Sequence, residues 1–247
     1  MIDDVRTVIW KEWRSLIHGQ SRRQLLIMTA TLTFWAVWLP VQTGSDWMTD
    51  GILSILISVL LPALVVAVTV PAAIAGERER KTLSTLLATR LPDDAILIGK
   101  LAIPVVLGCL AMVAVLVVGL VAANAASWDG SVRLYDPVVI VPDVIIGFEV
   151  AVAAAAAGVS ISLRARRVQD AQQTLSMMLM LPAMAFGFAL FVLMQLSGGI
   201  QVAAERLDGI SGWAVAAVAI VLFGVLDASL LVGARRRFQR GRLVKNL

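Results

Sequence analysis

Cysteine and histidine are nearly absent from this chain of 247 residues, which contains one of each. Cys109 stands alone within an apolar run, so the sequence predicts neither an intramolecular disulfide framework nor a cysteine metal site. His18 lies outside the long apolar runs, so a serine–histidine protease within the membrane and a histidine-ligated metal are both unsupported. We therefore predict no catalytic residue and no metal site on this chain.

Charged residues are also scarce, at 15% of the chain, whereas 59% of the residues are hydrophobic. A soluble domain has about 25% charged and about 45–50% apolar residues. An α-helix needs roughly 20 apolar residues to cross a hydrocarbon core of about 30 Å. The sequence predicts an all-α integral membrane protein with a single domain, 1–247. We expect a bundle over 24–234, crossing the membrane at about 24–41, 51–75, 97–123, 138–163, 174–196 and 213–234.

The N-terminal segment, 1–20, is amphipathic. Asp3 and Asp4 suit the start of a helix, and one face of that helix carries Val5, Ile9, Trp13, Leu16 and Ile17. The other side carries Arg6, Lys11, Glu12 and Arg14. This pattern predicts a helix lying in the membrane interface, with Trp10 and Trp13 at headgroup depth.

The basic residues orient the predicted bundle. With a cytoplasmic N-terminus, all 21 lysines and arginines except Arg133 and Arg206 lie on the cytoplasmic side. Both termini are then cytoplasmic, and the tail 235–247 is a basic anchor near anionic lipid, with no nucleic-acid partner implied. Short outer loops are expected near 42–50, 124–137 and 197–212, with interfacial aromatic residues at Trp47, Trp128, Tyr135 and Trp213.

The longest charged interruption runs from Gly76 to Lys100. An unbroken charge cluster, 77–81, is followed by Leu83, Leu86 and Leu87 at the spacing of one helix face. Pro92 ends that short helix, and Asp93 or Asp94 can cap the next one. Although Gly99 and Lys100 resemble the end of a phosphate-binding loop, Asp94 stands where that motif needs glycine, so there is no Walker A motif.

Two acidic residues fall within predicted membrane segments, Glu149 in the fourth and Asp227 in the sixth. An acidic side chain at that depth costs about 2.5–3.5 kcal/mol and normally faces a bundle interior or cavity. Two interpretations remain open: a polar part of a translocation path or proton switch, and a packing lock. Asp143, nearer the outer end, is expected to be solvated. Met177, Met180 and Met184 share a helix face, where adaptable packing is commoner than metal binding.

The segment GERERKTLSTLLATRLPDDAILIGKL resembles the motif after the second membrane helix of exporter-type ABC transporter permeases, the six-helix type V family. The family pattern is E-R-E-x-x-T-L-x-x-L-L-x-T-P, then an apolar pair and G-K. Residues that match it are Glu77, Arg78, Glu79, Thr82, Leu83, Leu86, Leu87, Thr89, Gly99 and Lys100. The chain departs from the pattern at Arg90, where the family has proline.

The resemblance implies a permease in a bacterial or archaeal cytoplasmic membrane that pairs with a second permease chain, identical or related. Each copy would dock a separate ATP-binding subunit, which carries ATP and magnesium, while this chain has no cofactor. A short cytoplasmic helix near 77–89 would couple this chain to the ATPase. The coupling residues on it would be Glu77, Arg78, Glu79, Arg80, Thr82, Leu83, Leu86 and Leu87. Its leucines would form an apolar contact ridge with charges at the rim.

Two alternatives remain. The chain could be a membrane scaffold or immunity-type protein that only recruits a cytoplasmic partner. It could also be a proton-coupled secondary transporter that uses Glu149 and Asp227 directly. The substrate is not specified by any of these residues.

Overall fold

A computed structural model of the chain describes residues 2–18, 21–44, 46–49, 52–82, 89–195 and 211–238. These ranges are helical apart from short connections, and they contain no strand. In chain order the helices are α1 (Ile2–His18), α2 (Ser21–Thr43), α3 (Asp46–Thr49), α4 (Ile52–Glu79), α6 (Asp93–Ala126), α7 (Pro137–Ser162), α8 (Val168–Gln195) and α10 (Gly212–Arg237).

Each predicted membrane segment overlaps one of the long described helices, α2, α4, α6, α7, α8 and α10. Within the described residues, four helices are long and apolar enough to cross a membrane: α4 over Val59–Glu79, and α6, α7 and α10 over their whole lengths. An α-helix with this length and composition satisfies its own backbone hydrogen bonds in lipid. The described chain is thus all-helical, and these four helices support an α-helical membrane protein.

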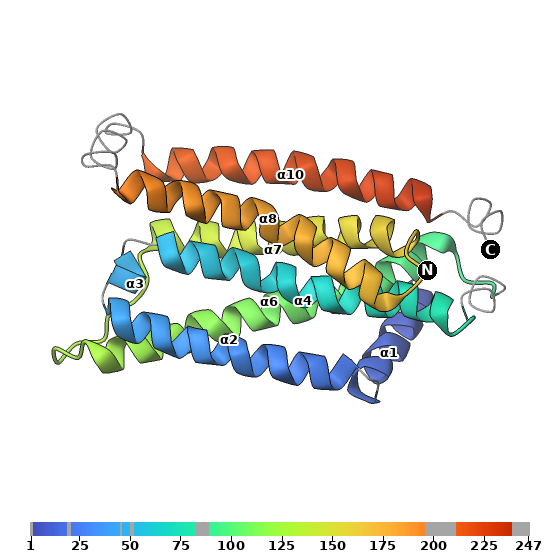
Figure 1. The fold of residues 1–247 in the computed structure, drawn as a ribbon, viewed down its shortest axis with the longest axis horizontal. Helices are drawn as coiled ribbons and strands as arrows, with labels where there is room; N and C mark the ends of the chain where they lie inside the picture. The colour runs from blue at the N-terminus through green and yellow to red at the C-terminus, as the bar shows by residue number, and fades with distance from the viewer. Residues whose placement is uncertain are drawn as a thin grey trace.

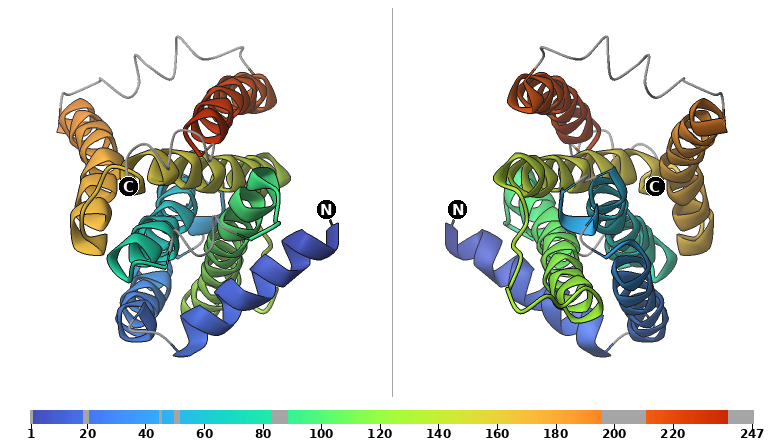
Figure 2. Two further views of the ribbon diagram at one scale, coloured as in Figure 1. Left: turned by 90° about the vertical axis from the view of Figure 1, so that its right-hand side faces the viewer. Right: turned by 90° about the vertical axis from the view of Figure 1, so that its left-hand side faces the viewer.

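Helix α7 lies at the centre of the arrangement, with α2, α4 and α6 on one side and α10 on the other (Figure 2). Helix α8 lies beside α4 and α7 and is splayed apart from α10. The alanines of α7 pack against α4, where Ala151, Ala154 and Ala155 are buried in the same cluster as Val66 and Val70. Small side chains let two helix backbones approach closely, which is how membrane helices associate without a hydrophobic driving force between them. The alanine-rich sequence of α7 therefore places it against α4.

One end of the bundle gathers α1, the end of α4, the start of α6, the end of α7, the start of α8 and the end of α10 (Figure 1). Helix α1 lies across this end, at a steep angle to the long helices (Figures 1 and 2). Basic residues are concentrated here: Arg78, Arg80, Lys81, Arg90, Lys100, Arg164, Arg166, Arg167, Arg235, Arg236 and Arg237. The charge is therefore polarised along the bundle axis, and we call this the basic end.

At the opposite end, Trp47 and Met48 of α3 are buried, contrary to the expectation that Trp47 lies at the membrane interface. Trp47 is 1% exposed, and its indole N–H donates to the Tyr135 hydroxyl over 2.9 Å. The Tyr135 hydroxyl in turn donates to the Leu116 carbonyl over 2.9 Å. Asp143, expected to be solvated, is fully buried in α7. Both expectations were wrong, and for Trp47 the reason is its contact with Tyr135 and Ala123, which no pattern within α3 alone reveals.

Candidate functional site

The end of α4 differs from the prediction. Glu77 to Glu79, assigned to a separate short helix, instead form the last turn of α4. The helix ends at a Schellman motif: Thr82 N–H donates to the Glu77 carbonyl over 2.9 Å, and Lys81 N–H to the Arg78 carbonyl over 3.0 Å. Lys81 supplies the left-handed residue that this motif requires, with φ 57°. Leu83, Leu86 and Leu87 lie outside the described residues, so the predicted leucine ridge stays a prediction.

Glu77 joins three elements at the basic end. Its Oε1 accepts from Lys11 Nζ of α1 over 2.5 Å and lies 3.6 Å from Lys100 Nζ of α6. Its other carboxylate oxygen accepts from the Thr82 hydroxyl. The Glu77 side chain is only 15% exposed, so this residue belongs to a network between α1, α4 and α6.

Lys100, on the first turns of α6, has a fully buried side chain. Its ammonium group donates to Glu12 Oε1 and to the Ala73 carbonyl, each over 2.7 Å. A buried ammonium group is tolerated only when carboxylates and carbonyls replace its lost hydration, and here two groups on α4, the Ala73 carbonyl and the Glu77 carboxylate, and the Glu12 carboxylate on α1 do so. Lys100 thereby ties α6 to α1 and α4.

The orientation of α1 consequently needs a correction. Glu12, predicted on the solvated side, is 5% exposed and faces the bundle, beside the buried Val8. Trp10 and Trp13 point outward and are 61% and 45% exposed, with the Arg14 guanidinium 5.3 Å from the Trp10 ring. The physical reason is Lys100, whose buried charge requires the Glu12 carboxylate on the inner face of α1.

Gly99 is the residue that allows α1 to approach. A Cβ added at Gly99 would lie 2.6 Å from both Cβ and Cγ1 of Val8, far inside van der Waals contact. The adjacent pair Gly99–Lys100 therefore has a structural meaning here: the glycine admits α1, and the lysine binds it. This explains the G-K pair without a phosphate ligand.

The residues after Glu77 bind two further helices. Arg78 Nη1 donates to the carbonyl of Leu163, at the end of α7, over 2.8 Å. The Glu79 carboxylate accepts from the backbone N–H of Val168, the first residue of α8, over 3.4 Å. An acidic side chain at a helix N-terminus satisfies an otherwise unpaired N–H and interacts favourably with the helix dipole. We name the set Lys11, Glu12, Glu77, Arg78, Glu79 and Lys100 the charged junction.

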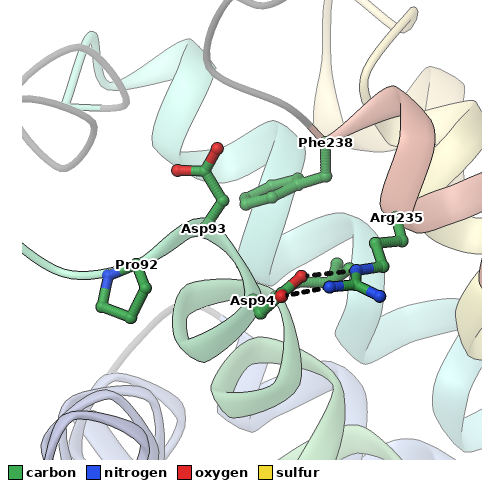
Figure 3. A pocket seen from close by; sticks show the side chains of 6 residues that line it. Pro92, Asp93, Asp94, Arg235 and Phe238 are labelled. Carbon is green, nitrogen blue, oxygen red and sulfur yellow. Dashed lines mark hydrogen bonds and ion pairs between the residues drawn. The ribbon is translucent and has the colours of Figure 1, made fainter. Parts of the chain in front are cut away.

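A second contact, between Asp94 and Arg235, lies where the chain enters α6. Asp94, in the first turn of α6, accepts from Arg235 Nε over 2.8 Å and from Arg235 Nη2 over 2.6 Å (Figure 3). Phe238, which is 1% exposed, lines the same pocket of about 260 Å³ with Pro92, Asp93 and Leu97. This bidentate Arg235–Asp94 ion pair joins the end of α10 to the start of α6.

Glu149 and Asp227, identified separately in the sequence, lie together where α7 packs on α10. Glu149 Oε1 is 3.4 Å from the position of a Cβ added at Gly224, one helical turn before Asp227. The two carboxyls interact electrostatically, and Asp227 is 8% exposed. The structure thus brings together the two predicted path residues, but at a distance from the charged junction.

Lys11, Glu12 and Lys100 were not predicted as one site. The available signal was Lys100 itself, because a lysine followed by a long apolar helix needs a carboxylate partner, and Glu12 and Glu77 were candidates. Among the described residues, no group of three or more His, Cys, Asp or Glu side chains could hold a metal ion. No protein-family model matches the chain, and no curated protein matches it.

Proposed function

We propose that this chain is the membrane-spanning permease subunit of an ATP-driven ABC exporter. In this proposal all six long helices cross a cytoplasmic membrane, α1 lies in the interface, and the basic end faces the cytoplasm. A second permease chain completes the translocation path, and an ATP-binding subunit docks against the segment near 77–89 of each copy. ATP and magnesium are held by that subunit.

The charged junction is the observation that supports this proposal. The 80–92 segment leaves α4 directly after Glu77, Arg78 and Glu79, which bind α1, α6, α7 and α8. It enters α6 at Asp94, which binds α10. A force applied to this segment is therefore transmitted at both of its ends to helices on either side of α7. A contact that only recruits a partner does not need such connections.

The polarised charge supports the orientation. Basic residues of short loops remain on the cytoplasmic side, and the described ones other than Arg133 gather at the end where α1 and residues 80–82 and 89–92 lie. An ATP-binding subunit in the cytoplasm would meet that end. The exposed Trp10 and Trp13 of α1 suit contact with lipid headgroups on the same side.

The test is co-expression with a candidate ATP-binding subunit, sought first in the adjacent reading frames, followed by purification in lipid nanodiscs. We expect the two chains to copurify and the complex to hydrolyse ATP. Replacing residues 83–88 with a Gly-Ser linker should abolish copurification. The matched control replaces 128–133, a segment of equal length at the opposite end, and should leave it intact. Copurification that survives the first replacement would contradict the proposal.

A proton-coupled secondary transporter is the second candidate, because Glu149 and Asp227 are paired within the bundle. Transport in energised vesicles separates the two functions. The exporter should stop when ATP is withdrawn and continue in the presence of a protonophore, whereas a proton-coupled transporter should respond in the opposite way.

A further inference from the structure

Helix α10 is attached to the described bundle mainly through α7. Asp227 and Ala234 are its buried residues, and large apolar side chains elsewhere on α10 are exposed, among them Val218, Val221, Leu222 and Val225. Arg235 and Phe238 bind only its last turn to α6. The middle of α10 is therefore held to α7 at a contact that contains a carboxyl group.

The opposing carboxyl group belongs to Glu149, midway along α7. Because Gly224 has no side chain, Glu149 Oε1 reaches the backbone of α10, with 3.4 Å to the position of an added Cβ. Asp227 follows Gly224 by three residues and so lies on the same face, one turn along. Glu149 Oε2 and Asp227 Oδ1 are both buried, and neither has a hydrogen-bond partner within the described ranges.

The described basic groups on α4, α6 and α10 lie towards the helix ends, and three of them bind other partners. Arg78 binds the Leu163 carbonyl, Lys100 binds Glu12 and Ala73, and Arg235 binds Asp94. The remaining titratable groups on α4, α6, α7, α8 and α10 are Glu77, Glu79, Asp93, Cys109, Asp143, Asp170, Arg236 and Arg237. Of these, Cys109 lies near the middle of its helix, and its thiol supplies no positive charge.

We propose that Glu149 and Asp227 form a proton-binding site at the α7–α10 contact, where the two carboxyls share one proton. Two adjacent carboxylates without a cation cannot both ionise in a medium of low dielectric constant. One protonated carboxyl can donate a hydrogen bond to its ionised neighbour, which satisfies both groups. Loss of the proton leaves two like charges facing each other and separates the middle of α10 from α7. Such a proton-binding site could form in an ATP-driven exporter and in a proton-coupled transporter alike.

The direct measurement is infrared difference spectroscopy of the full-length protein in nanodiscs, titrated with pH. We expect a protonated-carboxyl band at neutral pH that is absent from the Glu149→Gln/Asp227→Asn variant. Asp170→Asn, the same chemical change at an exposed site on α8, should retain the band. If the wild-type and double-variant bands are identical across the titration, the shared proton is ruled out.

A second measurement follows the thermal unfolding midpoint against pH. A proton held in the folded state and released on unfolding stabilises the fold at low pH, and this stabilisation is lost as pH rises. The wild type and Asp170→Asn should share this dependence, and Glu149→Gln/Asp227→Asn should lose it. To test whether a metal cation occupies the site instead of a proton, the sodium and potassium concentrations are varied at fixed pH. A midpoint that follows the cation concentration and not pH would overturn the proposal in favour of a bound metal cation.

Discussion

Lys100 of α6 donates to Glu12 of α1 over 2.7 Å, and both side chains are almost completely buried. This pair joins a helix lying across the end of the bundle to one that runs along it (Figure 1). Because Lys100 also binds the Ala73 carbonyl and lies beside Glu77, the same ammonium group holds α4. The described residues at the two ends of the α4–α6 connection, 80–82 and 89–92, therefore follow helices that are held by a contact outside this connection.

Lys100→Met should destabilise the protein strongly. Removing one partner of a buried ion pair leaves the other charge without compensation, which costs about 3–5 kcal/mol. The free energy of unfolding, measured by denaturant titration of the purified protein, checks this. Combining Lys100→Met with Glu12→Gln should recover much of the loss. Asp129→Asn, in an exposed pair with Arg133, is the control and should change the free energy of unfolding little. A Lys100→Met protein as stable as the wild type would contradict the structure.

Gly99→Ala should displace α1, because the added Cβ would meet Val8 at 2.6 Å. Overpacking of this kind costs about 1–3 kcal/mol. The clash includes the Val8 Cβ itself, so Val8→Ala cannot relieve it, whereas Val8→Gly can. The measurement is protease sensitivity of the α1–α2 connection together with the unfolding midpoint. Rescue of Gly99→Ala by Val8→Ala as efficient as rescue by Val8→Gly would show that α1 does not lie as described.

Tyr135, the only tyrosine, should lose its phenolic proton at a higher pH than a solvated tyrosine does. Burial raises its pKa to about 12, with a further contribution from the Asp143 carboxylate, against the opposing hydrogen bond from Trp47. Tyrosinate absorbance reports this one residue directly, and a midpoint near 10 would mean that the phenol is solvated. Since the folded pKa is raised, the stabilisation by neutral Tyr135 is complete below about pH 10. It is lost as pH rises towards about 12.

Leu86→Asp tests the coupling segment. If Leu83, Leu86 and Leu87 enter a cleft of the ATP-binding subunit, a charge there costs about 2 kcal/mol or more, or roughly thirty-fold in affinity. Membrane insertion should be unchanged, and ATP hydrolysis should be lost or uncoupled from transport. Binding of the ATP-binding subunit, measured by titration, checks the affinity. Unchanged binding with coupled transport would remove the coupling role. Charge reversal of Glu77 is unsuitable as a mild control because that side chain binds Lys11 and Lys100.

The sequence by itself determined the class of protein and the positions of the long helices. Apolar runs of membrane length and their charged ends fix these features locally, so the predicted segment 138–163 nearly coincides with α7 and 213–234 falls within α10. The end of α4 was placed too early because the charges of 77–79 were interpreted as leaving the membrane helix. In the structure those charges have partners on neighbouring helices, which allow α4 to continue to Glu79.

Tertiary structure alone decided which charges meet. Glu12 faces inward, Arg78 reaches Leu163, and Glu79 reaches Val168 because of how α1, α7 and α8 are rotated and placed against α4. The same holds for Glu149 and Asp227, which are far apart in the chain and meet where α10 packs on α7. Helical periodicity specifies which residues share a face, but the partner of that face follows from the packing of small and large side chains between helices.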